Sequence, residues 1–179
     1  MPDPRPEDGE SFITDEMRKW IGVECPPIIY QVTKDWIRKW CEAIGDFNPL
    51  FYDDDYARQH RWGGAVAPPT FLAALNPKET ERHAFKLPWS FSGRAGPGQA
   101  GHALDAFEFY RPVRPGDIII STQGVVDFYE KIGRNGRMLF TVWEVIMRNQ
   151  DGQLVAKMRT AFVGYGKPVP AAATRAAQV

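Results

Sequence analysis

Hydrophobic residues recur at helical spacing in the first half of the chain and at strand spacing in the second half. After Thr33, a good N-cap residue, apolar side chains at three- and four-residue intervals share one face until Gly45, which predicts an amphipathic helix. Shorter helices are predicted over Phe12–Ile21 and from Asp53 to His60. The run Pro68–Leu75 is apolar on all sides, which is typical of a helix surrounded by protein.

The second half contains four runs rich in β-branched and aromatic residues, which predict strands. They span Leu104–Arg111, Asp117–Tyr129, Met138–Arg148 and Leu154–Tyr165. Asn-Gly at 135–136 and Asp-Gly at 151–152 tolerate positive φ and predict tight hairpins between the last three runs. We therefore expect an α+β fold, with an antiparallel meander covered on one face by the apolar helix.

One domain is expected over residues 11–166, because 179 residues suffice for one core and are short for two. Residues 1–10 and 167–179 are rich in Pro and small residues and are interpreted as flexible ends. The segment Asn76–Gly101 contains several Gly and Pro residues without periodicity. A lid over a bulky ligand and a surface excursion with buried aromatics explain it equally well.

Charge and composition exclude several classes of function. Lys and Arg number 22 and Asp and Glu number 22, so no net field attracts nucleic acid or an anionic membrane surface. No apolar run approaches the roughly 18 residues of a membrane span. Cys25 and Cys41 lack a CxxC spacing and favour a reducing cytoplasm, and the three histidines lack metal-ligand spacing. We expect no metal and no cofactor.

Two motifs carry the specific signal. Gly45-Asp46-Phe-Asn48-Pro49 follows the amphipathic helix, and Arg111-Pro-Val-Arg-Pro-Gly-Asp117 precedes a strand. In this order, with Ala65-Val-Ala-Pro-Pro-Thr-Phe71 between them, the chain resembles the MaoC-like (hydratase-2) family. The Ala-Pro-Pro-Thr-Phe variant is similar to its FAS1-like dehydratase branch. The resemblance implies the hotdog fold, an antiparallel sheet wrapped around a central apolar helix.

The resemblance also implies a reaction, the reversible addition of water to a trans-2-enoyl thioester, giving a (3R)-hydroxyacyl-CoA. In the family an Asp and a His five residues later hold the water and transfer its proton. The family's Asp corresponds to Asp46 and its Asn corresponds to Asn48, but Phe51 occupies the position of the His. Without that His, Asp46 and Asn48 are expected to serve mainly as turn residues.

A second departure concerns the donor that polarises the thioester carbonyl. In the family a backbone N–H at the start of the central helix forms this oxyanion hole, and the aligned position here is Pro69, which has no N–H. The resemblance places Pro69, Thr70 and Phe71 along the bound substrate. A chain with Phe51 and Pro69 is expected to be a poor hydratase alone.

These departures suggest a degenerate subunit of a heteromeric (R)-specific enoyl-CoA hydratase, or 3-hydroxyacyl-CoA dehydratase. It would shape the pocket for an acyl-CoA or acyl-carrier thioester while a second hotdog subunit supplies the Asp/His pair. Two alternatives stay open: a self-sufficient homodimer that uses Asp46 with another acid such as His102, and a non-catalytic acyl-CoA-binding module. The apolar run Ile118–Ile120 is expected to pair with another chain if it lies at a sheet edge.

Overall fold

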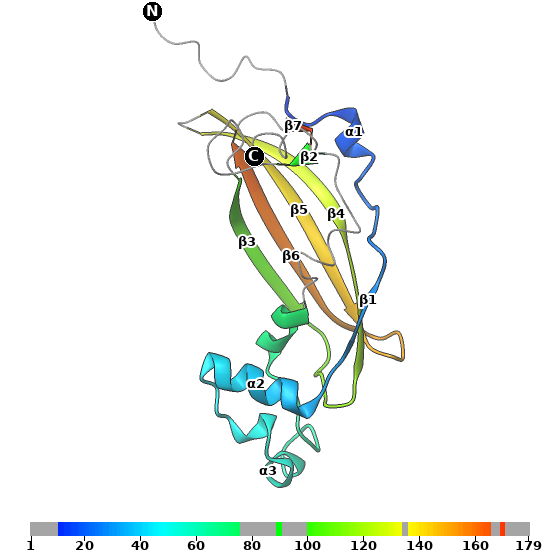
Figure 1. Cartoon of the computed structure of the whole chain (residues 1–179), viewed down its shortest axis with the longest axis vertical. Helices are drawn as coiled ribbons and strands as arrows, with labels where there is room; N and C mark the ends of the chain where they lie inside the picture. Colours follow the sequence, from blue (N-terminus) through cyan, green and yellow to red (C-terminus); the bar gives the residue numbers. More distant parts are fainter. Residues whose placement is uncertain (1–10, 76–88, 91–99, 134–135, 166–168, 171–179) are drawn as a thin grey trace, which may run out of the picture.

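An antiparallel sheet of five strands forms the body of the molecule (Figure 1). The computed structural model describes residues 11–75, 89–90, 100–133, 136–165 and 169–170. The strand order is β1-β4-β5-β6-β3. The strands span Ile28–Gln31 (β1), Ala100–Phe109 (β3), Ile118–Gly133 (β4), Gly136–Arg148 (β5) and Leu154–Tyr165 (β6). The expected antiparallel meander is confirmed, with β4, β5 and β6 as sequential neighbours.

A pair of two-residue strands, β2 (Trp89–Ser90) and β7 (Val169–Pro170), forms a second small sheet. This pairing joins Trp89–Ser90, from the 76–101 segment, to Val169–Pro170, from the C-terminal residues that were predicted to be flexible. Most of the 76–101 segment and the N-terminal residues 1–10 lie outside the described residues, so their predicted roles stay predictions.

Short helices follow the capping signals in the sequence. They are α1 (Asp15–Arg18), α2 (Lys34–Ile44), η2 (Pro49–Phe51), α3 (Asp54–Arg58) and η3 (Pro69–Leu75). The Thr33 hydroxyl accepts a hydrogen bond from the Trp36 N–H at 3.2 Å, and Gly45 ends α2 in the left-handed region with φ 70°. The apolar run at 68–75 is a 3₁₀ helix, in which the Phe71 N–H bonds to the Pro68 carbonyl three residues earlier.

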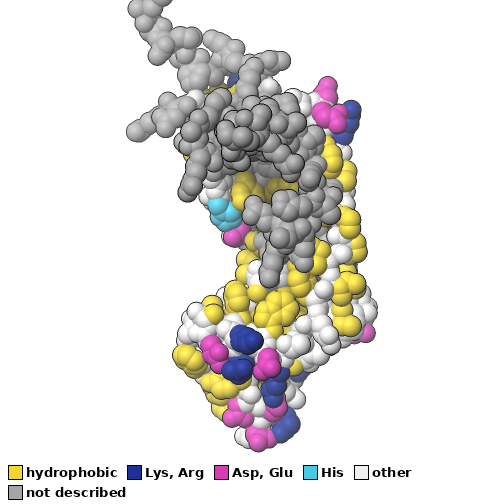
Figure 2. All heavy atoms as spheres, in the orientation of Figure 1, with side chains coloured by type: hydrophobic (Ala, Val, Ile, Leu, Met, Phe, Trp, Pro, Cys, Tyr) yellow, Lys and Arg dark blue, Asp and Glu magenta, His cyan; other side chains and the backbone are white. Residues whose placement is uncertain are grey.

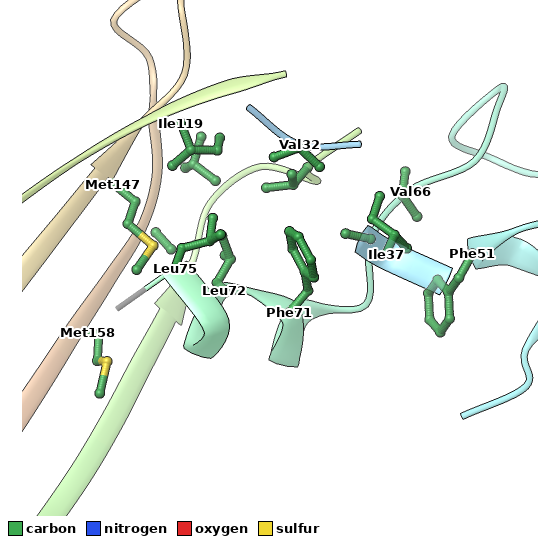
Figure 3. Close-up of a cluster of buried hydrophobic side chains, with 14 of the residues drawn as sticks. Val32, Ile37, Phe51, Val66, Phe71, Leu72, Leu75, Ile119, Met147 and Met158 are labelled. Carbon is green, nitrogen blue, oxygen red and sulfur yellow. The ribbon is translucent and has the colours of Figure 1, made fainter. Parts of the chain in front are cut away.

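The main core forms where η3 packs against one end of the sheet and against α2. Figure 3 shows Phe71, Leu72 and Leu75 pointing from η3 toward these neighbours. Phe71 is fully buried, and its ring lies edge-on to Trp36 with the centroids 5.2 Å apart. Leu75 and the sheet residues Ile119 and Met147 are also fully buried. The helical lobe and the sheet therefore share one hydrophobic core, to which η3 contributes Phe71, Leu72 and Leu75.

The edge expected at Ile118–Ile120 is absent. Residues Ile118–Ser121 of β4 pair with β1 on one side, and Ile120 pairs with Arg148 of β5 on the other. Beyond β1, the chain continues along β4 through a bridge between Glu24 and Gly124. A Cβ at Gly124 would lie 2.6 Å from the Val23 carbonyl oxygen, so only glycine permits this approach. The interpretation of β4 as an edge strand was therefore wrong, because the sequence did not reveal this cover.

No described helix is both long and apolar enough to cross a bilayer.

The packing of η3 generates the first prediction. Phe71→Ala is expected to lower the free energy of unfolding by about 3–5 kcal/mol, because it removes a fully buried ring from the joint between lobe and sheet. Urea denaturation measures this change. Phe47→Ala is the matched control, since that ring is 66% exposed and its loss should leave stability nearly unchanged. Equal effects of the two substitutions would contradict the assigned core.

The buried thiol of Cys41 generates the second prediction. Burial, and then the negative charge of Asp46, raise the pKa of Cys41 above its ordinary value. The thiol therefore stays protonated in the folded protein at mildly alkaline pH, and it should react with a disulfide reagent at pH 8 only after unfolding in urea. In a Cys25→Ser variant Cys41 is the single remaining cysteine, so the labelling can be assigned to it. Rapid labelling of Cys41 in the native protein would show that α2 opens readily.

Candidate functional site

A pocket of about 460 Å³ opens where the helical lobe meets the sheet. Three segments form its walls. The first is residues 50–51 of η2, and the second is the loop residues 61–62 and 66–68 together with Pro69 and Leu72 of η3. The third is residues 109–113, from the end of β3 into the connection to β4. This size lies within the usual range of small-molecule pockets. Most of the lining side chains are apolar, and Figure 2 shows hydrophobic side chains gathered where the sheet approaches the lobe.

Backbone hydrogen bonds hold the three walls together. The Ala67 N–H donates to the Val113 carbonyl at 2.7 Å, and the Val66 N–H donates to the Leu50 carbonyl at 3.4 Å. The Arg114 guanidinium donates to the Trp62 carbonyl. These contacts join η2, the 61–69 loop and the β3–β4 connection, so the pocket is formed by the fold itself.

Two arginines supply all the charge of the lining. The Arg61 guanidinium lies over the ring of Trp62, 4.0 Å from its centroid, and Arg111 belongs to the wall formed by residues 109–113. Both residues are exposed. An apolar cavity with exposed guanidinium groups suits a ligand that has an apolar body and a polar or anionic end.

The Asp46–Asn48 motif forms a turn. The Asp46 carboxylate accepts a hydrogen bond from the Asn48 N–H at 3.2 Å, and the Asn48 side chain accepts one from the Leu50 N–H at 3.0 Å. Neither side chain lines the pocket. Both oxygens are thus engaged in local turn and capping bonds, as these residue types commonly are.

Phe51 lies at the boundary between pocket and core. It is 7% exposed, lines the pocket and belongs to the core cluster around Phe71 (Figure 3). The position that the family resemblance assigns to an imidazole thus carries a ring without an ionisable group.

The wall at Ala67–Pro69 offers no free amide hydrogen. The Ala67 N–H is bound to the Val113 carbonyl, and Pro68 and Pro69 have none. Pro69 lines the pocket. A ligand carbonyl against this wall would therefore find no backbone donor there.

Thr70 and Phe71, the other two expected substrate-binding residues, lie outside the pocket lining. The Thr70 hydroxyl accepts a hydrogen bond from the Trp40 indole N–H at 3.3 Å. The Phe71 ring points into the core against Trp36. The helical turn after Pro69 directs these side chains toward α2, which sequence spacing did not reveal.

The alternative acid, His102, lies at the far end of β3 from the pocket. Its Nε2 is 3.0 Å from the Asp105 carboxylate and 3.0 Å from the Thr160 hydroxyl. Phe109, which lines the pocket, follows about 20 Å along the same strand. One protomer therefore does not bring His102 to its own pocket.

Other lining residues were not singled out from the sequence, chiefly Trp62, Arg61, Tyr110 and Val113. The Arg111–Asp117 motif was a signal for one of the walls, since Arg111 and Val113 stand in it. Trp62 and Arg61 carried no signal, because an Arg-Trp pair after a short helix has no characteristic spacing. Among the described residues, no group of three or more His, Cys, Asp or Glu side chains could hold a metal ion.

Relatives of known sequence share most of this chain. A UPF0336 protein of Parafrankia sp. is 32% identical over 145 residues, which cover 79% of this chain and 88% of that protein. A probable enoyl-CoA hydratase alpha subunit of Thermomonospora curvata is 30% identical over 133 residues, covering 69% of this chain but 41% of that longer protein.

Solved structures share the fold at about 20% identity. The ChsH1–ChsH2 complex of Mycobacterium tuberculosis contains a chain with a TM-score of 0.61, with 83% of this chain and 86% of that chain covered. The R-hydratase PhaJ1 of Pseudomonas aeruginosa has a TM-score of 0.57, with 83% and 84% covered. These likenesses establish the hotdog fold.

The family assignment rests on a match to the sequence pattern of a whole family. Residues 19–158 match the family described as the FAS1-like dehydratase domain region, and this range includes both sequence motifs and every wall of the pocket. The chain belongs to the FAS1-like dehydratase domain family.

Proposed function

We propose that this chain is the degenerate subunit of a heteromeric (R)-specific enoyl-CoA hydratase or 3-hydroxyacyl-CoA dehydratase. Its pocket holds the acyl part of a thioester, and a partner hotdog chain supplies the Asp/His pair for proton transfer. One observation carries the proposal. The pocket is preformed and apolar, yet Phe51 and the Ala67–Pro69 wall supply neither a proton-transfer group nor an amide donor.

The shape and polarity of the pocket support an acyl ligand. Its walls bury an apolar chain, while Arg61 and Arg111 lie where phosphate groups of CoA or of a carrier prosthetic group could approach. The proposal includes either kind of thioester, because both share these chemical features. No cofactor enters the reaction, since water addition needs only proton transfer and carbonyl polarisation.

The missing groups support the need for a partner. A general acid or base contributes about 10²- to 10⁴-fold to a rate, and one oxyanion donor contributes about 3–4 kcal/mol of transition-state stabilisation. Loss of both leaves little catalysis, although such losses do not add simply. The ChsH1–ChsH2 and HadBC complexes of Mycobacterium tuberculosis, which contain chains of this fold, support a paired assembly of two different hotdog chains.

The alternatives differ in the source of the proton-transfer group. A self-sufficient homodimer would use Asp46 with His102, but one protomer holds these residues apart, and Asp46 lies outside the pocket lining. A non-catalytic acyl-CoA-binding module would use the same pocket without any partner. The following two measurements separate these functions.

Ligand binding tests the pocket. Isothermal titration with octanoyl-CoA is expected to give one saturable site per protomer in the wild-type chain. Pro69→Trp should abolish this binding, because the indole would enter the pocket from an exposed wall position. Phe47→Ala is the control and should bind normally, since Phe47 does not line the pocket. Unchanged binding by a folded Pro69→Trp variant would place the ligand elsewhere.

Hydration tests the missing chemistry. Loss of enoyl-thioester absorbance with trans-2-octenoyl-CoA should be very slow with this chain alone, and Phe51→His should not restore it because the Ala67–Pro69 wall still lacks an N–H donor. Adding a hotdog chain with the Asp/His pair should restore turnover. Fast turnover by the wild-type chain that disappears in Asp46→Asn would favour the self-sufficient enzyme, and binding without turnover in any mixture would favour the binding module.

A further inference from the structure

The two arginines of the pocket lining, Arg61 and Arg111, form no ion pair with a carboxylate in the described part of the chain. No Asp or Glu stands among the lining residues. Exposed arginines elsewhere do pair with carboxylates, as Arg38, Arg58 and Arg159 show. Two positive charges at the solvent side of an apolar pocket are thus left for a ligand to neutralise.

The loop of residues 61–64 holds Arg61 in a defined orientation. Its guanidinium lies over the Trp62 ring, 4.0 Å from the centroid. A guanidinium stacked on an aromatic face keeps its N–H groups at the edge of its plane, where they can donate to a ligand. The Trp62 carbonyl in turn accepts a hydrogen bond from the Arg114 guanidinium. A Cβ on Gly64 would lie 3.5 Å from Nη1 of Arg114, so the same guanidinium also packs against the end of the loop.

The backbone of Arg111 is fixed where β3 ends. The N–H groups of Tyr110 and Arg111 both donate to the Val155 carbonyl, at 2.8 Å and 3.2 Å. Pro112 follows, and its ring fixes the backbone angle φ at the next position. The Arg111 side chain is exposed at the pocket lining. Because the backbone is already ordered, a ligand that binds this guanidinium has less conformational freedom to remove.

Two guanidinium groups on two walls suit a ligand with more than one phosphate group. Each guanidinium presents a planar set of N–H donors that binds phosphate oxygens in pairs. The polar end of a CoA thioester carries a diphosphate and a separate phosphate monoester. The arm of a carrier-bound thioester carries a single phosphodiester, which can neutralise one guanidinium and leaves the other without an anion.

The surroundings of the pocket are unfavourable for an acidic protein. Asp53 and Glu108 are exposed and lie in sequence beside the lining residues Phe51 and Phe109. Asp53 accepts backbone N–H groups of α3, and Glu108 accepts the Tyr110 hydroxyl, so both carboxylates bind neutral donors and keep their charge. A carrier domain with an acidic surface would meet these like charges across an interface. A CoA thioester brings no protein surface to this place.

We propose that Arg61 and Arg111 form a phosphate clamp that makes this pocket selective for CoA thioesters over thioesters bound to a carrier protein. The phosphate clamp is the pair of guanidinium groups that stand on two walls of the pocket. This inference rests on the proposed function for the acyl thioester as ligand and adds the class of thioester. The clamp itself needs only the phosphate end of the ligand, so it can be tested without an acyl chain.

Ligands with decreasing phosphate content test the clamp in the wild-type chain. Isothermal titration is expected to give decreasing affinity in the order octanoyl-CoA, octanoyl-phosphopantetheine and octanoyl-pantetheine, with about a tenfold loss for each charge-assisted contact removed. The affinity for octanoyl-CoA should fall as the salt concentration rises, because exposed charges are screened. The affinity for octanoyl-pantetheine, which has no phosphate, should change little. Equal affinities for octanoyl-CoA and octanoyl-pantetheine overturn the clamp.

Two single variants assign the contacts to residues. Arg61→Ala and Arg111→Ala should each weaken binding of octanoyl-CoA about tenfold and leave binding of octanoyl-pantetheine unchanged. Arg18→Ala is the matched control, since this exposed arginine of α1 does not line the pocket and its loss changes the net charge equally. An equal loss of affinity for both ligands would mean that the arginines only shape the pocket, and it overturns the clamp.

A carrier-bound ligand tests the selectivity. An octanoyl-acyl-carrier protein is expected to bind about tenfold more weakly than octanoyl-CoA, because one guanidinium stays without an anion and the acidic surface of the carrier meets Asp53 and Glu108. Binding of the carrier-bound ligand as tight as that of octanoyl-CoA overturns the selectivity.

Free CoA separates the clamp from the acyl pocket. If free CoA binds and Arg61→Ala abolishes this binding, while octanoyl-pantetheine does not bind, the clamp is supported and the proposed acyl function is contradicted. If octanoyl-pantetheine binds and both arginine variants keep the wild-type affinity for octanoyl-CoA, the proposed function stands and the clamp is overturned. If none of these ligands binds, both are overturned.

Discussion

The burial of one ring, Phe71, is the contact on which the arrangement of this molecule depends. It is the fully buried aromatic side chain of η3, and its ring contacts Trp36 and Trp40 of α2. The core cluster to which it belongs also includes the sheet residues Ile119 and Met147. Burial of a Phe side chain contributes on the order of 1.5–3 kcal/mol before packing is considered. Because η3 also supplies Pro69 and Leu72 to the pocket, the same contact that attaches the lobe positions a wall of the site.

Local signals in the sequence were sufficient for most elements of the fold. Thr33 and Gly45 mark the two ends of α2 through bonds and dihedral angles that depend only on nearby residues, and Gly152 turns the β5–β6 hairpin in the left-handed region. The edge of the sheet was not predictable in this way. Whether β4 or β3 is left open depends on where residues 21–31 run, which is a long-range choice without a local pattern.

In the candidate site, too, some residues were predictable from the sequence, whereas others depend on long-range packing. The family resemblance directed attention to Phe51 and Pro69, and both line the pocket. Trp62 and Arg61 come from a loop whose position is set by the bond from Arg114 to the Trp62 carbonyl, 52 residues away in sequence. Thr70 and Phe71 point elsewhere because a 3₁₀ turn rotates successive side chains by about 120°. The spacing of residues in the sequence therefore could not specify the direction of the side chains at the start of η3.

The Ala67–Pro69 wall has a consequence for the lifetime of a bound thioester. An enzyme that activates a carbonyl with hydrogen bonds also makes it more sensitive to attack by stray water, so activation and protection oppose each other. This wall has no amide hydrogen to give, because one is bound to Val113 and the two prolines have none. In the proposed heteromeric enzyme, such a subunit would hold a reactive acyl group without activating it, and the partner chain that carries the acid would set the timing of the chemistry.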